Sequence, residues 1–130
     1  ERQTYNKQNY FNMTLETIRD TILTLNNTDI FEQTRRREVI EMRCVANQYM
    51  SKIKQMRLSE IVRDYKRCGF KTHHATILHS LKNYKHNCYY NPDLELVMKS
   101  LIDDSKLYVM RQIPKATNEQ LQLIEEILMN

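Results

Sequence analysis

Residues 58–81 read LSEIVRDYKRCGFKTHHATILHSL. Its first half places apolar side chains at three- and four-residue intervals, the spacing of one face of a helix. Gly69 follows this pattern, and glycine ends helices readily because it adopts positive φ without strain. The stretch therefore predicts a short amphipathic helix that ends in a turn at Gly69. The apolar residues of that helix are Leu58, Ile61, Val62 and Tyr65.

A second helix is expected directly after the turn, because Thr72 is a residue type that caps helix N-termini. We expect a polar first turn and an apolar face that points inward. A short helix, a turn and a second helix with a polar start follow one another in helix-turn-helix DNA-binding motifs. The residues expected to face inward are Ala75, Ile77, Leu78 and Leu81.

The same helical period recurs on both sides of this stretch. It predicts a first helix within residues 10–25 and a long helix over residues 39–53. Pro92 and Asp93 open a further helix, since proline and acidic residues are favoured in a first helical turn. A last helix is predicted over residues 118–129.

The composition agrees with an all-α class. The 130 residues include one glycine and two prolines, whereas a β-sandwich or β-barrel needs many glycine-bearing turns. A single glycine also excludes the glycine-rich loops that bind nucleotide phosphates. No apolar run approaches the roughly 20 residues of a membrane-spanning helix, so we expect no membrane partner. Three cysteines at wide spacing and no visible signal peptide favour a reducing, cytoplasmic compartment.

Positive charge is concentrated in the middle of the chain. Residues 1–34 carry a net charge of −2, residues 35–86 a net charge of +9, and residues 87–130 a net charge of −3. A basic segment between mildly acidic ends is typical of a protein that binds a polyanion. The alternative interpretation is a solvated surface of lysine and arginine side chains.

The predicted second helix has the chemistry needed to read DNA. Hydroxyl and imidazole groups at its start can exchange hydrogen bonds with base edges in the major groove. Cationic side chains and the amides at the helix N-terminus can bind phosphates. An arginine segment before the long helix can enter a minor groove, where negative potential attracts arginine. The candidates are Thr72, His73, His74 and Thr76 for bases, Arg57, Lys71 and Lys82 for phosphates, and Arg35, Arg36 and Arg37 for the minor groove.

Residues 35–102 resemble the C-terminal DNA-binding domain, domain IV, of the bacterial replication initiator DnaA. The family signature Asp-His-Thr-Thr-Val-Leu-His-Ala aligns with residues 73–80, HHATILHS. Residues 58–61, LSEI, are similar to the family's Leu-Pro-Glu-Ile at the start of the first motif helix. Arg43 matches an arginine of the long helix, and residues 35–37 fall where the family has its basic loop. The signature is identical at His74, Thr76, Leu78 and His79, and conservative at Ile77.

This resemblance implies a Trp-repressor-like helix-turn-helix that binds double-stranded DNA. By position, it implies that His74 contacts a base, that Thr76 contacts a phosphate or base edge, and that Arg35 enters the minor groove. It also implies that Arg43 and His79 support contacts with the DNA backbone.

Two departures bear on the DNA target. His73 stands where the signature has aspartate, and Ala75 stands where it has its first threonine. The family's target sequence is therefore not implied for this chain. The turn over residues 66–71 is longer than the family's, and these 130 residues do not contain the family's ATPase module.

These observations predict an all-α protein with a helical extension at residues 1–30, a DnaA-like domain at residues 31–110 and a C-terminal helix at residues 111–130. The predicted function is non-catalytic, sequence-preferring binding of double-stranded DNA, without cofactor or metal. The predicted setting is replication or regulation in the cytoplasm or nucleoid of a bacterial cell, including phage and mobile-element proteins. The predicted DNA-binding set is Arg35, Arg36, Arg37, Arg43, Arg57, Lys71, Thr72, His73, His74, Thr76, His79 and Lys82.

Other interpretations of the same residues are weaker. Four histidines near Cys68 and Cys88 suggest zinc, but they lack the paired spacing of a zinc site. Cys68 with His73 has no surrounding motif of a catalytic pair, so no enzyme is predicted. The tyrosines could stack on unpaired bases, although packing at the core's edge is the favoured interpretation.

The alternative function is a protein-interaction adaptor. In this hypothesis the mildly acidic terminal helices bind a protein partner or a second copy of the chain. Leu121 and Ile124 of the last helix would then contribute to the contact.

Overall fold

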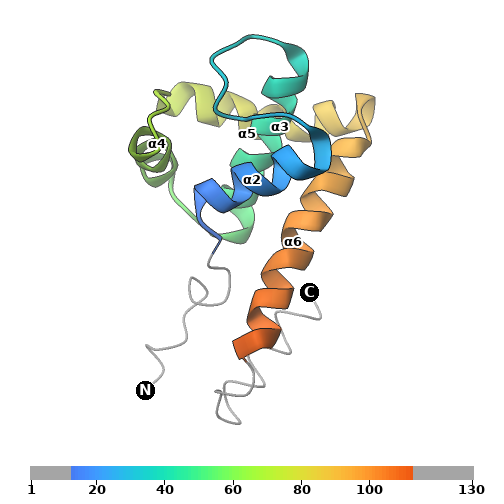
Figure 1. Ribbon diagram of the computed structural model, residues 1–130. Helices are drawn as coiled ribbons and strands as arrows, with labels where there is room; N and C mark the ends of the chain where they lie inside the picture. Colours follow the sequence, from blue (N-terminus) through green and yellow to red (C-terminus); the bar gives the residue numbers. More distant parts are fainter. Residues whose placement is uncertain (1–12, 113–130) are drawn as a thin grey trace.

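The computed structural model describes residues 13–112, with side chains through residue 104 (Figure 1). Within that range the chain forms five α-helices and one π-helical turn, without a strand. The all-α class is therefore confirmed, whereas the predicted helix at residues 118–129 lies outside the described residues. The elements are α2 (Leu15–Asn26), α3 (Arg37–Gln48), η2 (Tyr49–Ile53), α4 (Leu58–Arg67), α5 (His74–Tyr90) and α6 (Asp93–Gln112).

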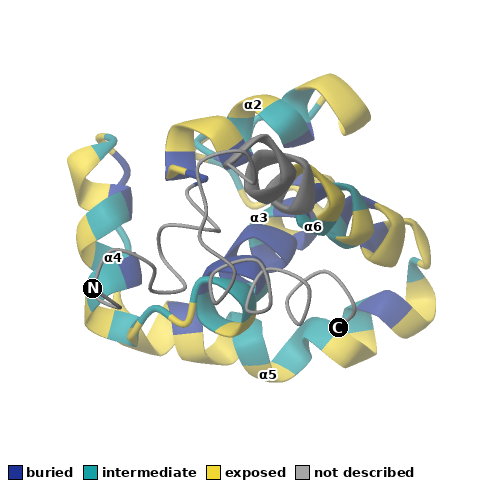
Figure 2. Ribbon diagram, turned by 90° about the horizontal axis from the view of Figure 1, so that it is seen from below, coloured by how far each residue is buried: buried dark blue, intermediate teal, exposed yellow. Residues whose placement is uncertain are grey.

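Helix α3 is the centre of the fold. In Figure 2 it is buried along most of its length, with the other helices around it. Its side chains are buried on nearly all sides, as expected for a helix enclosed by its neighbours. The polar members of the buried set must then find partners inside the protein. The buried residues of α3 are Val39, Glu41, Met42, Cys44, Val45, Ala46 and Asn47.

Helix α2 is part of this core. Leu15, Ile18 and Ile22 lie at the three- and four-residue spacing of one helix face, and each is completely buried. Thr14 caps the helix by accepting a hydrogen bond from the Thr17 amide at 3.2 Å. Asn27 ends it in the left-handed region at φ 54°. The packing of α2 is therefore continuous across the boundary predicted at residue 30, between the helical extension and the DnaA-like domain.

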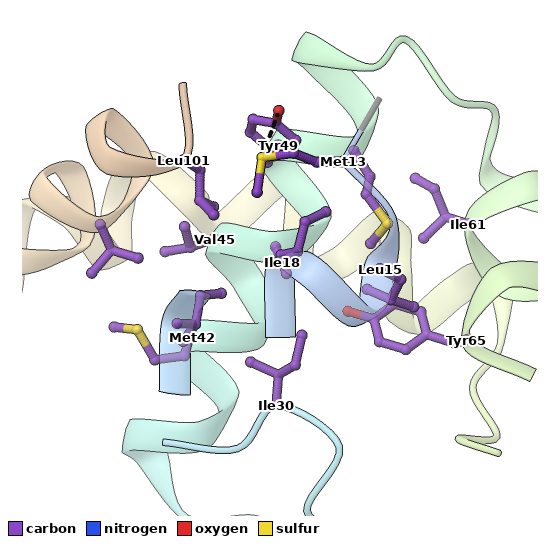
Figure 3. Packing of buried hydrophobic residues seen from close by; sticks show 14 of the residues in the cluster. Met13, Leu15, Ile18, Ile30, Met42, Val45, Tyr49, Ile61, Tyr65 and Leu101 are labelled. Carbon is purple, nitrogen blue, oxygen red and sulfur yellow. Dashed lines mark hydrogen bonds between the residues drawn. The ribbon is translucent and has the colours of Figure 1, made fainter. Parts of the chain in front are cut away.

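The core is one continuous cluster (Figure 3). It joins Leu15 and Ile18 of α2 with Val45 of α3, Tyr65 of α4 and Leu101 of α6. Side chains from distant parts of the sequence thus cover α3 from several directions, and burial of this apolar surface is the main force that holds the helices together.

The long predicted helix over residues 39–53 is correct except at its end. The α-helical hydrogen bonds stop at Gln48 and the chain widens into the π-turn η2, in which the Lys54 amide bonds the Tyr49 carbonyl at 3.2 Å. Gln55 then takes a left-handed conformation at φ 58°. This wider turn carries the chain out of α3 and toward α4.

Helix α6 begins as predicted. Asp93 lies in its first turn, and the Asp93 amide donates a hydrogen bond to the Asn91 side chain at 3.2 Å. Leu94, Val97 and Leu101 point into the core. No helix between residues 13 and 112 has both the length and the apolar character needed to cross a membrane.

Candidate nucleic-acid interface

Helix α4 supports the turn that leads to α5. Glu60 accepts a hydrogen bond from the Arg57 amide at 2.8 Å, which stabilises the start of α4. Ile61 and Tyr65 anchor the helix, because both are completely buried. One face of α4 thus belongs to the core, and the opposite face is polar.

The end of α4 is a Schellman turn centred on Gly69. Gly69 has φ +85°, and its amide bonds the Lys66 carbonyl at 3.0 Å. The Phe70 amide reaches back to the Tyr65 carbonyl at 2.9 Å, and the Phe70 side chain is buried. The predicted helix end at Gly69 is confirmed, and the turn fixes the direction in which the chain enters α5.

Helix α5 starts one residue later than the cap at Thr72 would place it. The N-cap is His73, and no side chain caps the helix. Its first amides therefore lack the side-chain acceptor that usually satisfies a helix N-terminus. His74, Ala75 and Thr76 are all exposed in this first turn.

The predicted inward face of α5 is only partly right. Ile77 is 1% exposed and is the buried anchor of this region, while Leu81 is half-buried. Leu78 is 41% exposed and Ala75 is exposed as well, so these two predicted core residues lie outside. His79 is also exposed, and its ring lies 2.9 Å from the Asn83 side-chain nitrogen.

Buried polar groups hold α5 against α3 and α4. Asn47 of α3 is 2% exposed; its amide oxygen accepts from the Tyr65 hydroxyl at 2.6 Å, and its amide nitrogen donates to the Ser80 hydroxyl at 3.1 Å. The Cys44 thiol donates to the Ser80 carbonyl at 3.1 Å. Because each of these bonds has a defined direction, the network fixes the position of α5 relative to its two neighbours.

Arg43 joins the loop before α3 to the turn before α5. Its Nε donates to the Ile30 carbonyl at 2.9 Å, and its Nη2 donates to the Glu32 carbonyl at 2.7 Å. The same guanidinium lies 4.6 Å from the centroid of the Phe70 ring, a cation–π distance. Burial lowers the pKa of Arg43. The side chain expected to support DNA-backbone contacts is thus directed at the protein's own carbonyls.

The arginine segment lies on that same loop. Arg35 is exposed, and Arg36 forms a 2.9 Å ion pair with Glu32. Arg37 starts α3 and reaches Glu41 at 3.3 Å, while its own side chain is 73% exposed. Arg43 therefore links the loop that carries these arginines to Phe70, in the turn that leads to α5.

The loop has a second attachment at α2. Arg19 bonds both carboxylate oxygens of Asp29 at 2.9 Å, and this pairing holds the pKa of Asp29 below its ordinary value. A bidentate pair of this kind has a defined geometry. The Asp29 carboxylate also accepts from the Phe31 amide at 3.0 Å, which fixes the loop's backbone.

The remaining predicted cations divide into two groups. Lys71 and Lys82 are exposed on the turn and on α5, and Lys85, one turn further along, is exposed too. Arg57 lies at the N-terminal end of α4, opposite the end that leads to α5. The structure therefore gathers the lysines along α5 and leaves Arg57 apart from its start.

The three cysteines are buried or half-buried. Cys44 and Cys88 are buried, and burial raises the pKa of both thiols. Cys68 is half-buried. Within the part of the chain that the structure describes, no three histidine, cysteine or acidic side chains are placed to hold a metal ion.

A polar groove lies elsewhere, between α2 and α6. Asp20, Asp103 and Asp104 line it together with several threonines of α2. Its carboxylates repel an anionic ligand, so the groove and the basic interface have opposite electrostatic character. None of the predicted DNA-binding residues lines it.

No family model, curated protein or solved structure matches this chain.

Proposed function

We propose that this protein binds double-stranded DNA through a helix-turn-helix of the DnaA domain IV type, without catalysing a reaction. In this proposal α3 is the long supporting helix, α4 is the first motif helix, and α5 is the recognition helix. The order and relative lengths of these helices support the proposal. The turn is long, since Cys68–His73 separate α4 from α5.

One observation carries the proposal: the first turn of α5 is polar and exposed, while the helix itself is held rigidly. His73, His74 and Thr76 face solvent, and Ile77 directly after them is buried. Short polar side chains on a fixed helix are what base edges in a major groove require. The proposed base readers are therefore His74 and Thr76, with His73 at the helix entrance.

Phosphate contacts would come from the cations around this turn. Lys71 and Lys82 lie on either side of the proposed base readers in the sequence, and both are exposed. The uncapped amides of α5 add donors for a phosphate oxygen. Arg35 lies on the loop that Arg43 ties to Phe70, and Arg37 starts α3 directly after it. Both are exposed, so we propose them for the adjoining minor groove.

The first experiment is fluorescence anisotropy with a labelled pool of random duplexes and matched single strands, at two salt concentrations. Duplex binding that weakens with salt is expected, because phosphate contacts release counterions. Absence of duplex binding at low salt would contradict the proposal.

A selected duplex then allows His74 to be tested. We expect His74→Ala to reduce discrimination between target and random duplex by about 1–3 kcal/mol, the usual effect of losing a base contact. His86→Ala is the matched control, because it removes an exposed imidazole three turns further along the same helix. An equal loss of affinity for all sequences would place His74 on the DNA backbone instead.

The adaptor hypothesis has less support from the described residues. The apolar face of α2 is enclosed in the core, with Ile18 and Ile22 completely buried, and this face cannot also bind a partner. Leu121 and Ile124 lie outside the described residues. Binding of a protein partner that persists at high salt and requires Leu121 and Ile124 would favour the adaptor role.

A further inference from the structure

The C-terminal half of α5 exposes two neighbouring tyrosines that the proposed duplex contact does not use. Tyr89 is 79% exposed and Tyr90 is 62% exposed. Their ring centroids lie 5.0 Å apart with perpendicular planes, and the His86 ring lies 4.9 Å from Tyr90. Most of the tyrosines are predicted to pack at the edge of the core, and this pair does not, whereas Tyr49 and Tyr65 are completely buried.

Cations share the face of this helix with Tyr89. Lys85 follows Lys82 by three residues, and Tyr89 follows Lys85 by four. The three side chains therefore lie on one side of the helix, and all are exposed. Residues 74–90 contain no aspartate or glutamate. The nearest acidic residues along the chain are Asp93 and Glu95, in the first turn of α6.

We propose that Lys82, Lys85, Tyr89 and Tyr90 form a platform for unpaired bases of single-stranded DNA, in addition to the proposed duplex contact. Aromatic faces stack on bases of any sequence, and lysines alongside them follow the phosphates. The centre of a protein–protein interface, in contrast, is depleted in lysine. The mixture of exposed tyrosine and lysine on a helix that itself contains no carboxylate therefore favours a nucleic acid over a protein partner.

The position of the tyrosines along α5 leaves room for a single-strand contact beside the duplex contact. Thirteen residues separate Thr76 from Tyr89, which corresponds to about 20 Å of helix. A strand that leaves a duplex held at the start of α5 could follow the lysines toward the tyrosines. The choice of DNA over RNA rests on the proposed duplex function, while the stacking chemistry stands on the exposed rings themselves.

The test compares binding of a labelled, unstructured DNA strand of about a dozen nucleotides to three double variants. Tyr89→Phe with Tyr90→Phe keeps both rings and should bind within about twofold of the parent chain. Tyr89→Leu with Tyr90→Leu, and the corresponding alanine pair, should bind about tenfold more weakly or worse. Leu96→Ala is the control, since Leu96 is an exposed apolar residue of α6, 64% exposed.

The outcomes separate the two proposals. Retained single-strand affinity in the leucine pair would overturn the platform, because apolar area alone would then suffice. Equal weakening in the phenylalanine pair would also overturn it, because the hydroxyls and not the rings would then matter.

Sedimentation that reveals a dimer abolished by the alanine pair, with no single-strand binding, would assign the tyrosines to a second copy of the chain. Duplex binding unchanged in all three variants would show that the two tyrosines are not part of the duplex contact, and tyrosine-dependent single-strand binding without duplex binding would refute only the proposed function.

Discussion

At the scale of single residues, Arg43 has the largest structural role among the predicted DNA contacts. It contacts Ile30, Glu32 and Phe70, which lie on two segments far apart in the sequence. A planar guanidinium can donate to two carbonyls in different directions while its face covers an aromatic ring. This combination positions the arginine loop relative to the turn before α5.

We predict that Arg43→Lys lowers the free energy of unfolding by about 1–3 kcal/mol, because an ammonium cannot replace both carbonyl contacts and the ring contact. Urea unfolding followed by circular dichroism measures the loss. Arg63→Lys is the control, because Arg63 is an exposed arginine of α4. Equal stability of the Arg43 variant and the parent chain would mean that the loop's other contacts, such as the Arg19–Asp29 pair, hold it without Arg43.

The sequence predicted that Arg43 matters but not how. An arginine in a basic region is expected to face a polyanion, and a one-dimensional pattern contains no information on which backbone carbonyls lie nearby. Ile30 and Glu32 lie outside the helices, so their carbonyls have no partner within a helix, and Arg43 supplies donors to both. The resemblance to DnaA domain IV implied that Arg43 supports DNA-backbone contacts. Arg43 can do so indirectly, by positioning the loop that carries Arg35.

At the scale of secondary-structure elements, the sequence predicted helices well and their exposed faces less well. Periodicity located α2, α3, α4 and α6, because each has an apolar stripe that is buried in the structure. In α5 it failed for Ala75 and Leu78, which are exposed. Alanine and leucine also occur on exposed helix faces. Helix α5 is held to α3 by the buried Ile77 and by the bonds of Cys44 and Asn47 to Ser80, so Ala75 and Leu78 are not needed in this contact.

The end of α4 provides a prediction about an element boundary. Gly69 has φ +85°, and a β-carbon built there meets nothing within 4 Å, so only backbone strain opposes a side chain. We predict that Gly69→Ala lowers the free energy of unfolding by about 1–2 kcal/mol, the cost of the left-handed conformation for an L-residue. Chemical denaturation is the appropriate measurement.

Gly69→Asn is the matched variant, because asparagine tolerates the left-handed region better than alanine does. We expect the asparagine variant to be the more stable of the two. If alanine and asparagine cost the same, then some property other than backbone conformation limits this position.

At the scale of the whole molecule, the structure unites parts that the sequence divided. The helical extension predicted at residues 1–30 contributes four completely buried residues, Leu15, Ile18, Ile22 and Ile30, to the core around α3. Helical periodicity identified this apolar face but not the surface that would cover it. Pairing between distant elements depends on three-dimensional packing, which no local pattern in the sequence specifies.

A surface ion pair adds a long-range link between α2 and α4. Arg67 bonds the two carboxylate oxygens of Glu16 at 2.7 and 3.0 Å, and it also bonds Asp64 at 2.7 Å. The Arg67 side chain holds the pKa of Glu16 at about 2, below its ordinary value of 4.5. Because Glu16 and Arg67 are each about half exposed, solvent and salt weaken their attraction.

This link predicts a defined pH dependence of stability. A carboxyl group whose pKa is lowered by folding stabilises the protein fully above its ordinary pKa, and this contribution is lost as the pH falls from 4.5 toward 2. We predict that Glu16→Gln slightly lowers the free energy of unfolding at pH 7 and that its difference from the parent chain disappears near pH 2. Urea unfolding across this range measures the effect, with Arg67→Gln as the second background. A Glu16→Gln effect that stays constant with pH, or that persists in the Arg67→Gln background, would show that the ion pair does not link α2 to α4.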